Sequence, residues 1–187
     1  EANYFCTNYI DCRPQAIGRI QHFVSRKAMN IDGLGDETIR LFYDLGFLRD
    51  IADIYNLNYD EISKIEGYGE KSVDNLRAGI EESKLNPFQK VLFAIGIRYV
   101  GESASKKIIK NVDSIDKLAN MDIESLSSID EIGDKTAKSI ADFFSDINNI
   151  QIINKLKSFG LNFYQKDNDI QSAKLNGKIF VISGVFE

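Results

Sequence analysis

Apolar residues recur at every third or fourth position along two long stretches of the chain, a spacing that predicts amphipathic helices. The apolar positions are Val73, Leu76 and Ile80 in the first stretch, and Ala137, Ile140 and Phe144 in the second. In a helix each set lies on one face, which is expected to pack into a core and implies no chemistry. We expect core positions, and not exposed stacking platforms, for Phe42, Tyr43, Phe47, Phe88, Phe93, Phe143 and Phe144.

Three short stretches predict helix starts. Asn86-Pro87-Phe88-Gln89 combines a cap, a proline at the first helical position and a glutamine placed to complete a capping box. Asn58 with Glu61 gives a similar signal. Pro14 opens an earlier helical stretch that carries His22, the only histidine of the chain. A lone histidine on a helix is expected to be a packed or exposed residue and not a ligand.

The pattern changes towards the end of the chain. Leu161-Asn162-Phe163-Tyr164 alternates between apolar and polar residues, which predicts a short strand. The following residues, 165–172, are polar and lack a period, so we interpret 165–173 as a linker. We expect the remaining residues to begin a domain that they do not complete. Their strand at 179–183 is expected to be disordered or to pair with the edge of a neighbour.

A short pattern of an apolar residue, a tight turn and a glycine occurs four times between the predicted helices. The copies are Ile31-Asp32-Gly33-Leu34-Gly35, Ile65-Glu66-Gly67-Tyr68-Gly69, Ile97-Arg98-Tyr99-Val100-Gly101 and Ile129-Asp130-Glu131-Ile132-Gly133. Their last glycines are 34, 32 and 32 residues apart. A period of this size indicates an array of one supersecondary unit. The unit here is helix, hairpin, helix, so the sequence predicts an all-α fold of tandem helix-hairpin-helix units with four hairpins.

The chemistry of such a hairpin favours a phosphate ligand. Glycine accepts a positive φ, so glycines on both sides of one apolar residue permit a sharp turn. The helix that follows begins with amide groups that lack internal partners, and these amides bind anions. Lys71 and Lys135, two places after the last glycine, add charge at the same point. Any single copy is more simply explained as an ordinary turn, but four copies at nearly one period favour binding.

Composition excludes some functions and leaves others open. The chain has 187 residues, of which 43% are hydrophobic and 27% charged, as in an ordinary globular protein. A net charge of −5 argues against a general surface for polyanions. It does not argue against binding of nucleic acid through backbone amides. No apolar run of membrane-spanning length and no signal-peptide pattern is present, so we expect a cytoplasmic protein.

The cysteines are a weak metal signal by themselves. Cys6 and Cys12 are the only two in the chain. A closed zinc site needs four ligands, of which a pair supplies half. The alternatives are a buried pair of thiols or, less plausibly for a cytoplasmic chain, a disulfide.

Residues 22–35 closely resemble the segment that joins the zinc finger to the helix-hairpin-helix domain in bacterial NAD-dependent DNA ligases. The third hairpin, from Ala94 to Glu102, is similar to the third hairpin of that family. The stretch from Leu175 to Gly184 resembles the first strand of its C-terminal BRCT domain. The resemblance covers nearly the whole chain in the order of the family.

The resemblance implies four parts. Residues 1–28 would be the second half of a four-cysteine zinc finger, with Cys6 and Cys12 as zinc ligands, and a connecting helix. Residues 29–164 would be the helix-hairpin-helix DNA-binding domain, 165–173 the linker and 174–187 the start of an incomplete BRCT domain. The chain would be a monomer that binds nicked double-stranded DNA without reading sequence.

The catalytic part of the family is expected to lie before Glu1. Its adenylated lysine occurs in a Lys-x-Asp-Gly motif, which is absent here. NAD and magnesium would therefore bind outside this chain, which should be inactive alone. The main alternative is a helix-hairpin-helix module of another repair or recombination protein. A base-excision glycosylase and a protein-interaction module are further alternatives, of which the glycosylase lacks its expected catalytic residues.

The hairpins differ in their expected contribution to DNA binding. The third and fourth have Tyr99 and Glu131 where the first two have a glycine. Glu37 takes the lysine place in the first hairpin, which we therefore expect to be mainly structural, and Ser103 takes it in the third. Lys106 and Lys107 support the third hairpin or belong to a solvated helix face. The predicted DNA contacts are Gly67, Gly69, Lys71, Arg98, Val100, Gly101, Lys106, Ile132, Gly133 and Lys135, with Gly33 and Gly35 as weaker candidates.

Overall fold

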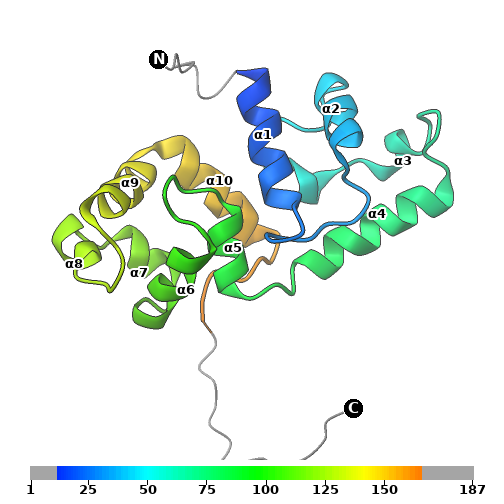
Figure 1. Cartoon of the computed structure of the whole chain (residues 1–187). Coiled ribbons are helices and arrows are strands. Elements are labelled where there is room, and N and C mark those ends of the chain that lie inside the picture. The colour runs from blue at the N-terminus through cyan, green and yellow to red at the C-terminus, as the bar shows by residue number, and fades with distance from the viewer. Residues whose placement is uncertain (1–11, 166–187) are drawn as a thin grey trace, which may run out of the picture.

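The computed structural model describes residues 12–165, and within this range the chain is helical (Figure 1). Its elements in order are α1 (Arg13–Val24), α2 (Asp36–Asp44), the 3₁₀ helix η1 (Asp53–Asn56), α3 (Tyr59–Ile62), α4 (Glu70–Ser83), α5 (Phe88–Ala94), α6 (Glu102–Asn111), α7 (Ile115–Ala119), α8 (Ile123–Ser127), α9 (Asp134–Ser145) and α10 (Ile147–Ser158). The predicted all-α fold is confirmed for this part of the chain. None of its helices is long and apolar enough to cross a membrane.

Helix α1 lies between the two groups of hairpin helices. In Figure 1, α2 to α4 lie on one side of α1, and α6 to α10 lie on the other. Arg13 forms an ion pair of 2.7 Å with Asp44 at the end of α2. At the opposite end of α1, His22 Nε2 lies 2.9 Å from the carbonyl oxygen of Phe93, and the two rings meet edge to face. His22 is therefore a packed helix residue, as predicted.

The predicted apolar faces form the core. Val73, Leu76 and Ile80 of α4 are buried, as are Ala137 and Ile140 of α9. The aromatic residues follow the same expectation. Buried are Phe42, Tyr43 and Phe88, and partly buried against the core are Phe47, Phe93, Phe143 and Phe144. Packing of these inner faces thus fixes the helices that follow the second and fourth hairpins.

The predicted helix starts are correct in two cases and wrong in one detail. The side chain of Asn58 accepts a hydrogen bond from the amide of Glu61, as a cap should. Pro14 is the second residue of α1, in the first turn. Helix α5 does begin at Phe88, but Asn86 is not its cap. The Asn86 amide instead donates to the carbonyl oxygens of Met29 and Ser83, and so ties the end of α4 to the segment after α1.

The alternating stretch after α10 pairs only briefly. Leu161 and Phe163 are buried, and Phe163 accepts a hydrogen bond of 2.9 Å from the amide of Ile115. A single antiparallel bridge joins Ser114 to Tyr164, so the predicted strand is an isolated bridge that closes the chain onto the start of α7. Cys6, the linker from 166 onward and the 174–187 segment lie outside the described residues. The division of the chain into four parts therefore stays a prediction.

Candidate nucleic-acid interface

All four hairpins share one turn geometry. The residue two places before the last glycine has a positive φ, which is 90° at Gly33, 88° at Gly67, and 65° at both Tyr99 and Glu131. In the last three hairpins the next amide donates to the carbonyl oxygen of the leading isoleucine, at 2.9 to 3.0 Å. A four-residue turn with a positive φ at its third residue has the pattern of type II. The third and fourth hairpins therefore keep the turn without its glycine.

The last glycine of each hairpin has a different role from the one that the sequence suggested. Its backbone is extended and not left-handed, with φ of −71° at Gly35 and Gly69 and −80° at Gly101 and Gly133. The prediction that a positive φ requires glycine here was wrong. A Cβ built at any of the four meets no atom within 4 Å. The glycine therefore leaves the start of the following helix open to an approaching ligand.

The helices that follow the hairpins begin without a side-chain cap. Helices α2, α4, α6 and α9 each start after one of these glycines, and no side chain accepts from their first amides. Four other helices are capped by their own residues. The capping side chains belong to Asn58, Ser114, Asp122 and Asp146, at the starts of α3, α7, α8 and α10. The uncapped amides remain available to an external anion such as phosphate.

The residue before the last glycine anchors each turn. Leu34, Val100 and Ile132 are buried, as the sequence predicted for anchors. Tyr68 is half-buried, and its ring centre lies 5.3 Å from that of Phe42 on α2. Burial of these side chains fixes the turn to the core and directs the open helix start outwards. The side chains of Val100 and Ile132 thus support the turns, and the predicted contact of these two residues with DNA stays a prediction.

An acidic residue at the first helical position was missed by the sequence interpretation. It follows the last glycine in every hairpin, as Asp36, Glu70, Glu102 and Asp134. A carboxylate there interacts favourably with the helix dipole, but it also lies beside the proposed phosphate position. The signal was visible in the sequence as a Gly-Asp or Gly-Glu pair in each copy. Next to these acids, Lys71 and Lys135 are exposed.

The basic residues of the third hairpin divide into two kinds. Arg98 is exposed, and its guanidinium lies 5.0 Å from the ring centre of Tyr99 at the tip of the turn. Lys106 is also exposed. Lys107, by contrast, forms ion pairs with Asp130 and Glu131 of the fourth hairpin. Lys107 is therefore paired with the fourth hairpin and not free to support the third hairpin at a phosphate.

The first hairpin packs against α4. A Cβ at Gly33 would lie 3.4 Å from Cα of Leu76, and one at Gly79 would lie 3.0 Å from the carbonyl oxygen of Asp32. Gly79 is thus needed for the close approach of the loop to the helix. These contacts suit the mainly structural role that Glu37 suggested for this hairpin. The helix start at Gly35 nevertheless has the same open space as the other three.

Each pair of hairpins matches a family model. Residues 25–82, with the first two hairpins, match a family described as a SAM-like helix-hairpin-helix tandem. Residues 90–153, with the last two, match a family described as a helix-hairpin-helix motif. We call these the first pair and the second pair. The comparison thus agrees with the four turns seen in the structure.

The whole chain is similar to part of several curated proteins named DNA ligase. It is 49% identical over 189 residues to that of Flavobacterium psychrophilum. It is 48% identical over 188 residues to that of Bacteroides fragilis, and 48% identical over 190 residues to that of Cytophaga hutchinsonii. Each match covers 100% of this chain and 28% of the relative. This chain thus contains helix-hairpin-helix motifs and is similar over its whole length to one segment of proteins named DNA ligase.

The possible metal site of this ligase-like segment is only partly within the described residues. Cys12 is a free thiol, half-buried, directly before α1. Among residues 12–165, no group of three or more His, Cys, Asp or Glu side chains is placed to hold a metal ion. Cys6 lies outside that range. The assignment of Cys6 and Cys12 to zinc therefore stays a prediction.

A cavity of about 510 Å³ lies between α1, the loop after α2, and helices α9 and α10. Its wall includes Arg19, Arg49 and Lys155, and its apolar side includes Ile20 and Phe143. The lining includes Ile95, just before the third turn, but no residue of the four five-residue turns themselves. The cavity is therefore separate from the four open helix starts.

Proposed function

We propose that this chain holds nicked double-stranded DNA through the open helix starts at Gly69, Gly101 and Gly133, as the non-catalytic part of a DNA ligase. The observation that supports this most is the repeated combination of an uncapped helix and a glycine with free space above it. Lys71 and Lys135 add positive charge at two of these starts. Arg98 and Lys106 add it at the third hairpin.

Backbone amides suit a protein that must bind any sequence. Contacts to phosphate fix position on a duplex but carry no sequence information. The helix dipole and several unpaired amides attract an anion without a basic surface. A net charge of −5 is therefore compatible with DNA binding by this chain. We place the contact on the sugar-phosphate backbone of the minor groove, on both sides of a nick.

The relatives are named DNA ligase, and we propose that the parent protein joins DNA strands in replication and repair. We propose that the parent is an NAD-dependent enzyme of the bacterial cytoplasm and that NAD and magnesium bind outside this chain. No Lys-x-Asp-Gly sequence is present here. Incubation of this chain with NAD should therefore give no covalent adenylate by mass spectrometry. A lysine adduct would contradict this division of labour.

We propose that Cys6 and Cys12 supply half of a structural zinc site in the parent protein. Two thiolates leave two positions of a tetrahedral zinc site without a protein ligand. The chain alone should therefore hold zinc weakly and stay monomeric. Metal analysis after gel filtration tests this. One tightly held zinc per monomer would contradict the half-site, and one zinc per dimer would indicate that two chains share an ion.

The proposal is tested by fluorescence anisotropy with a labelled nicked duplex over a range of salt concentrations. Each phosphate neutralised by Lys or Arg contributes roughly 0.9 to the salt slope, whereas an amide contact releases fewer counterions. We expect binding that is independent of sequence and has a low slope. The Gly101→Val and Gly133→Val proteins should bind more weakly, because the new side chain fills the space above the amides.

Gly18→Val is the matched control. Gly18 also has no atom within 4 Å of a built Cβ, but it lies on α1, outside the hairpins. Circular dichroism must show that all three proteins are folded. If the folded hairpin variants bind as tightly as the parent and the control, the hairpins are only turns. The proposed DNA-binding surface would then be wrong.

A further inference from the structure

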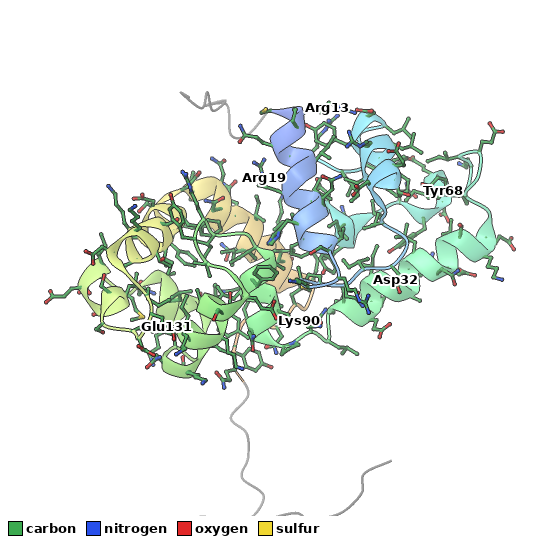
Figure 2. All side chains as sticks on the ribbon, in the orientation of Figure 1. Arg13, Arg19, Asp32, Tyr68, Lys90 and Glu131 are labelled. Atoms are coloured by element: carbon green, nitrogen blue, oxygen red, sulfur yellow. The ribbon has the colours of Figure 1, made fainter. Side chains whose placement is uncertain are left out.

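Lys107 joins the third hairpin to the fourth. It lies on α6, the helix that begins at Gly101 of the third hairpin. Its Nζ is 2.8 Å from Oδ2 of Asp130 and 2.9 Å from Oε1 of Glu131, two successive residues of the fourth turn, where Figure 2 labels Glu131. One side chain therefore joins the helix after the third turn to the fourth turn.

The fourth turn needs this support more than the second turn does. Glu131 has a φ of 65°, a left-handed conformation that costs free energy for any residue with a Cβ. Gly67 has the same place in the second hairpin and adopts a φ of 88° without that cost. The ion pair with Lys107 holds the Glu131 side chain, and with it the turn, in the conformation that glycine adopts freely.

The charge around Gly133 gives Lys107 a second effect. Asp130, Glu131 and Asp134 place carboxylates within a few residues of the open helix start, on both sides of it. Within a Debye length, about 10 Å at 0.1 M salt, these charges repel a phosphate bound there. Lys135 offsets one of them. Lys107 pairs with both carboxylates of the turn and so reduces the repulsion at the site.

The first pair solves the same docking problem by other means. Leu41 lies six places after Gly35, as Lys107 lies six places after Gly101, and Leu41 carries no charge. The second hairpin is docked on its partner helix by the Tyr68 side chain, which contacts Thr38 and Phe42. Ile132, at the place of Tyr68, has no polar group. The second pair therefore uses an ionic bridge to hold its later turn against the preceding helix, and the first pair uses a tyrosine for the same purpose.

We infer that Lys107 is a positioning residue for DNA binding: from α6 it holds the fourth turn and removes carboxylate charge from the helix start at Gly133, without touching the DNA. The inference rests on the proposed function. It predicts that Lys107→Ala weakens binding of a nicked duplex by roughly two- to fivefold, the range expected for exposed ion pairs. The salt slope should change by clearly less than one, because no phosphate contact is lost and only carboxylate repulsion, which salt screens, is added.

Four variants separate this role from others in anisotropy titrations over a range of salt. Lys107→Ala removes the bridge, and Lys107→Arg retains it and should restore affinity. Glu131→Gly removes one carboxylate and the backbone strain. In the Glu131→Gly background, Lys107→Ala should reduce the affinity for DNA clearly less than it does in the parent. The reason is that Glu131→Gly has already removed one carboxylate and the strained turn that Lys107 stabilises. This coupling and the rescue by arginine would not follow from a general loss of stability.

Each result of the experiment has a definite meaning. If the salt slope of Lys107→Ala is lower than that of the parent by about one, Lys107 contacts a phosphate and the inference is overturned. Equal affinity of Lys107→Ala and the parent also overturns it while leaving the proposed function intact. Absence of parent binding to the nicked duplex refutes the proposed function itself. Backbone amide shifts of 129–134 in the free protein test the positioning role without DNA, and unchanged shifts in Lys107→Ala would contradict it.

Discussion

The hydroxyl of Tyr68 donates a hydrogen bond of 2.9 Å to Oγ1 of Thr38, which joins the second hairpin to the helix that follows the first. The ring of Tyr68 also lies against Phe42, one turn further along the same helix. The anchor of one hairpin is thus held by the helix that starts at the other. The open helix starts at Gly35 and Gly69 therefore have a fixed separation.

Tyr68→Phe should lower the free energy of unfolding by about 1 kcal/mol, because it removes this hydrogen bond and keeps the ring contact. Urea unfolding followed by circular dichroism measures the change. Thr38→Val is the matched variant on the other side of the bond. The double variant should cost little more than the more harmful single one. Fully additive costs would show that the two groups do not interact.

Two buried serines on equivalent helices should respond in opposite ways to replacement by alanine. Oγ of Ser105 on α6 is buried and has no hydrogen-bond partner within the described residues. Oγ of Ser83 on α4 donates to the carbonyl oxygen of Ile80 at 2.7 Å and shares a hydrogen bond of 2.9 Å with Tyr55. Both hydroxyls are thus buried, but only that of Ser83 forms hydrogen bonds within the described residues.

Ser105→Ala should leave the unfolding free energy unchanged or raise it by up to about 1 kcal/mol, because an unpaired buried hydroxyl is unfavourable. Ser83→Ala should lower it by about 1 kcal/mol. Ala137 already stands at the place of Ser105 in the fourth hairpin, four residues after the last glycine. Thermal and urea unfolding compare the two variants. A loss of stability in Ser105→Ala would show that its hydroxyl has a partner.

The period of the glycines was sufficient to predict the hairpins, even where a glycine is absent. Tyr99 and Glu131 adopt the same left-handed turn as Gly33 and Gly67, because the leading isoleucine and the buried anchor fix both ends of the turn. Local pattern decides this geometry. The same pattern misled about Gly133, whose glycine is explained by open space and not by its φ.

Contacts between elements were beyond prediction from the sequence. Lys107 and Asp130 are far apart along the chain, and their pairing depends on how α6 packs beside the fourth turn. The sequence predicted Asn86 as a helix cap, but its side-chain amide donates a hydrogen bond to the carbonyl oxygen of Met29, which is distant in sequence. In both cases a polar side chain had a local interpretation, and a tertiary partner prevailed over it.

Acid titration should reveal the bridge between Lys107 and Asp130. The hydrogen bond that Lys107 donates to Asp130 holds the pKa of Asp130 below the ordinary value of 3.8. Lys107→Ala should raise this pKa towards 3.8, as measured by NMR of the side-chain carboxyl carbon. The backbone amide of Ser125 lowers the pKa of Asp122, which serves as the control and should not respond. Equal shifts of both residues would indicate a general change in the protein.

The same bridge predicts how stability depends on pH. The folded pKa of Asp130 is lowered, so its contribution is present above the ordinary pKa and is lost as the pH falls through the folded value. The pKa of Lys107 is raised by the two carboxylates, so it stays charged at neutral pH. Ordinary carboxyl groups have pKa values of about 4, so Asp130 is ionised in both the folded and the unfolded protein above about pH 5. The difference in unfolding free energy between the parent and Lys107→Ala should therefore be constant from about pH 5 to 7. Urea unfolding at several pH values would contradict the bridge if the difference were as large well below about pH 3.

The sharpest separation of stability from binding is expected from Gly133→Asp. The extended backbone at Gly133 suits a capping residue, and Asp is a better helix cap than Gly by a few tenths of a kcal/mol. Its carboxylate would occupy the amides at the start of α9 that we assign to a DNA phosphate. The protein should thus be slightly more stable and bind nicked duplex at least about tenfold more weakly, which is a loss of about 1.4 kcal/mol.

Gly133→Asn provides the matched comparison, because its side chain caps the same amides without a charge. It should weaken binding less than Gly133→Asp, and the difference between the two measures repulsion of the phosphate. Gly18→Asn, on α1, controls for an added polar side chain away from the hairpins. Anisotropy titrations give affinity, and thermal unfolding gives stability, for all three proteins. If Gly133→Asp is stabilised and binds DNA as tightly as the parent, the amides of α9 do not hold a phosphate.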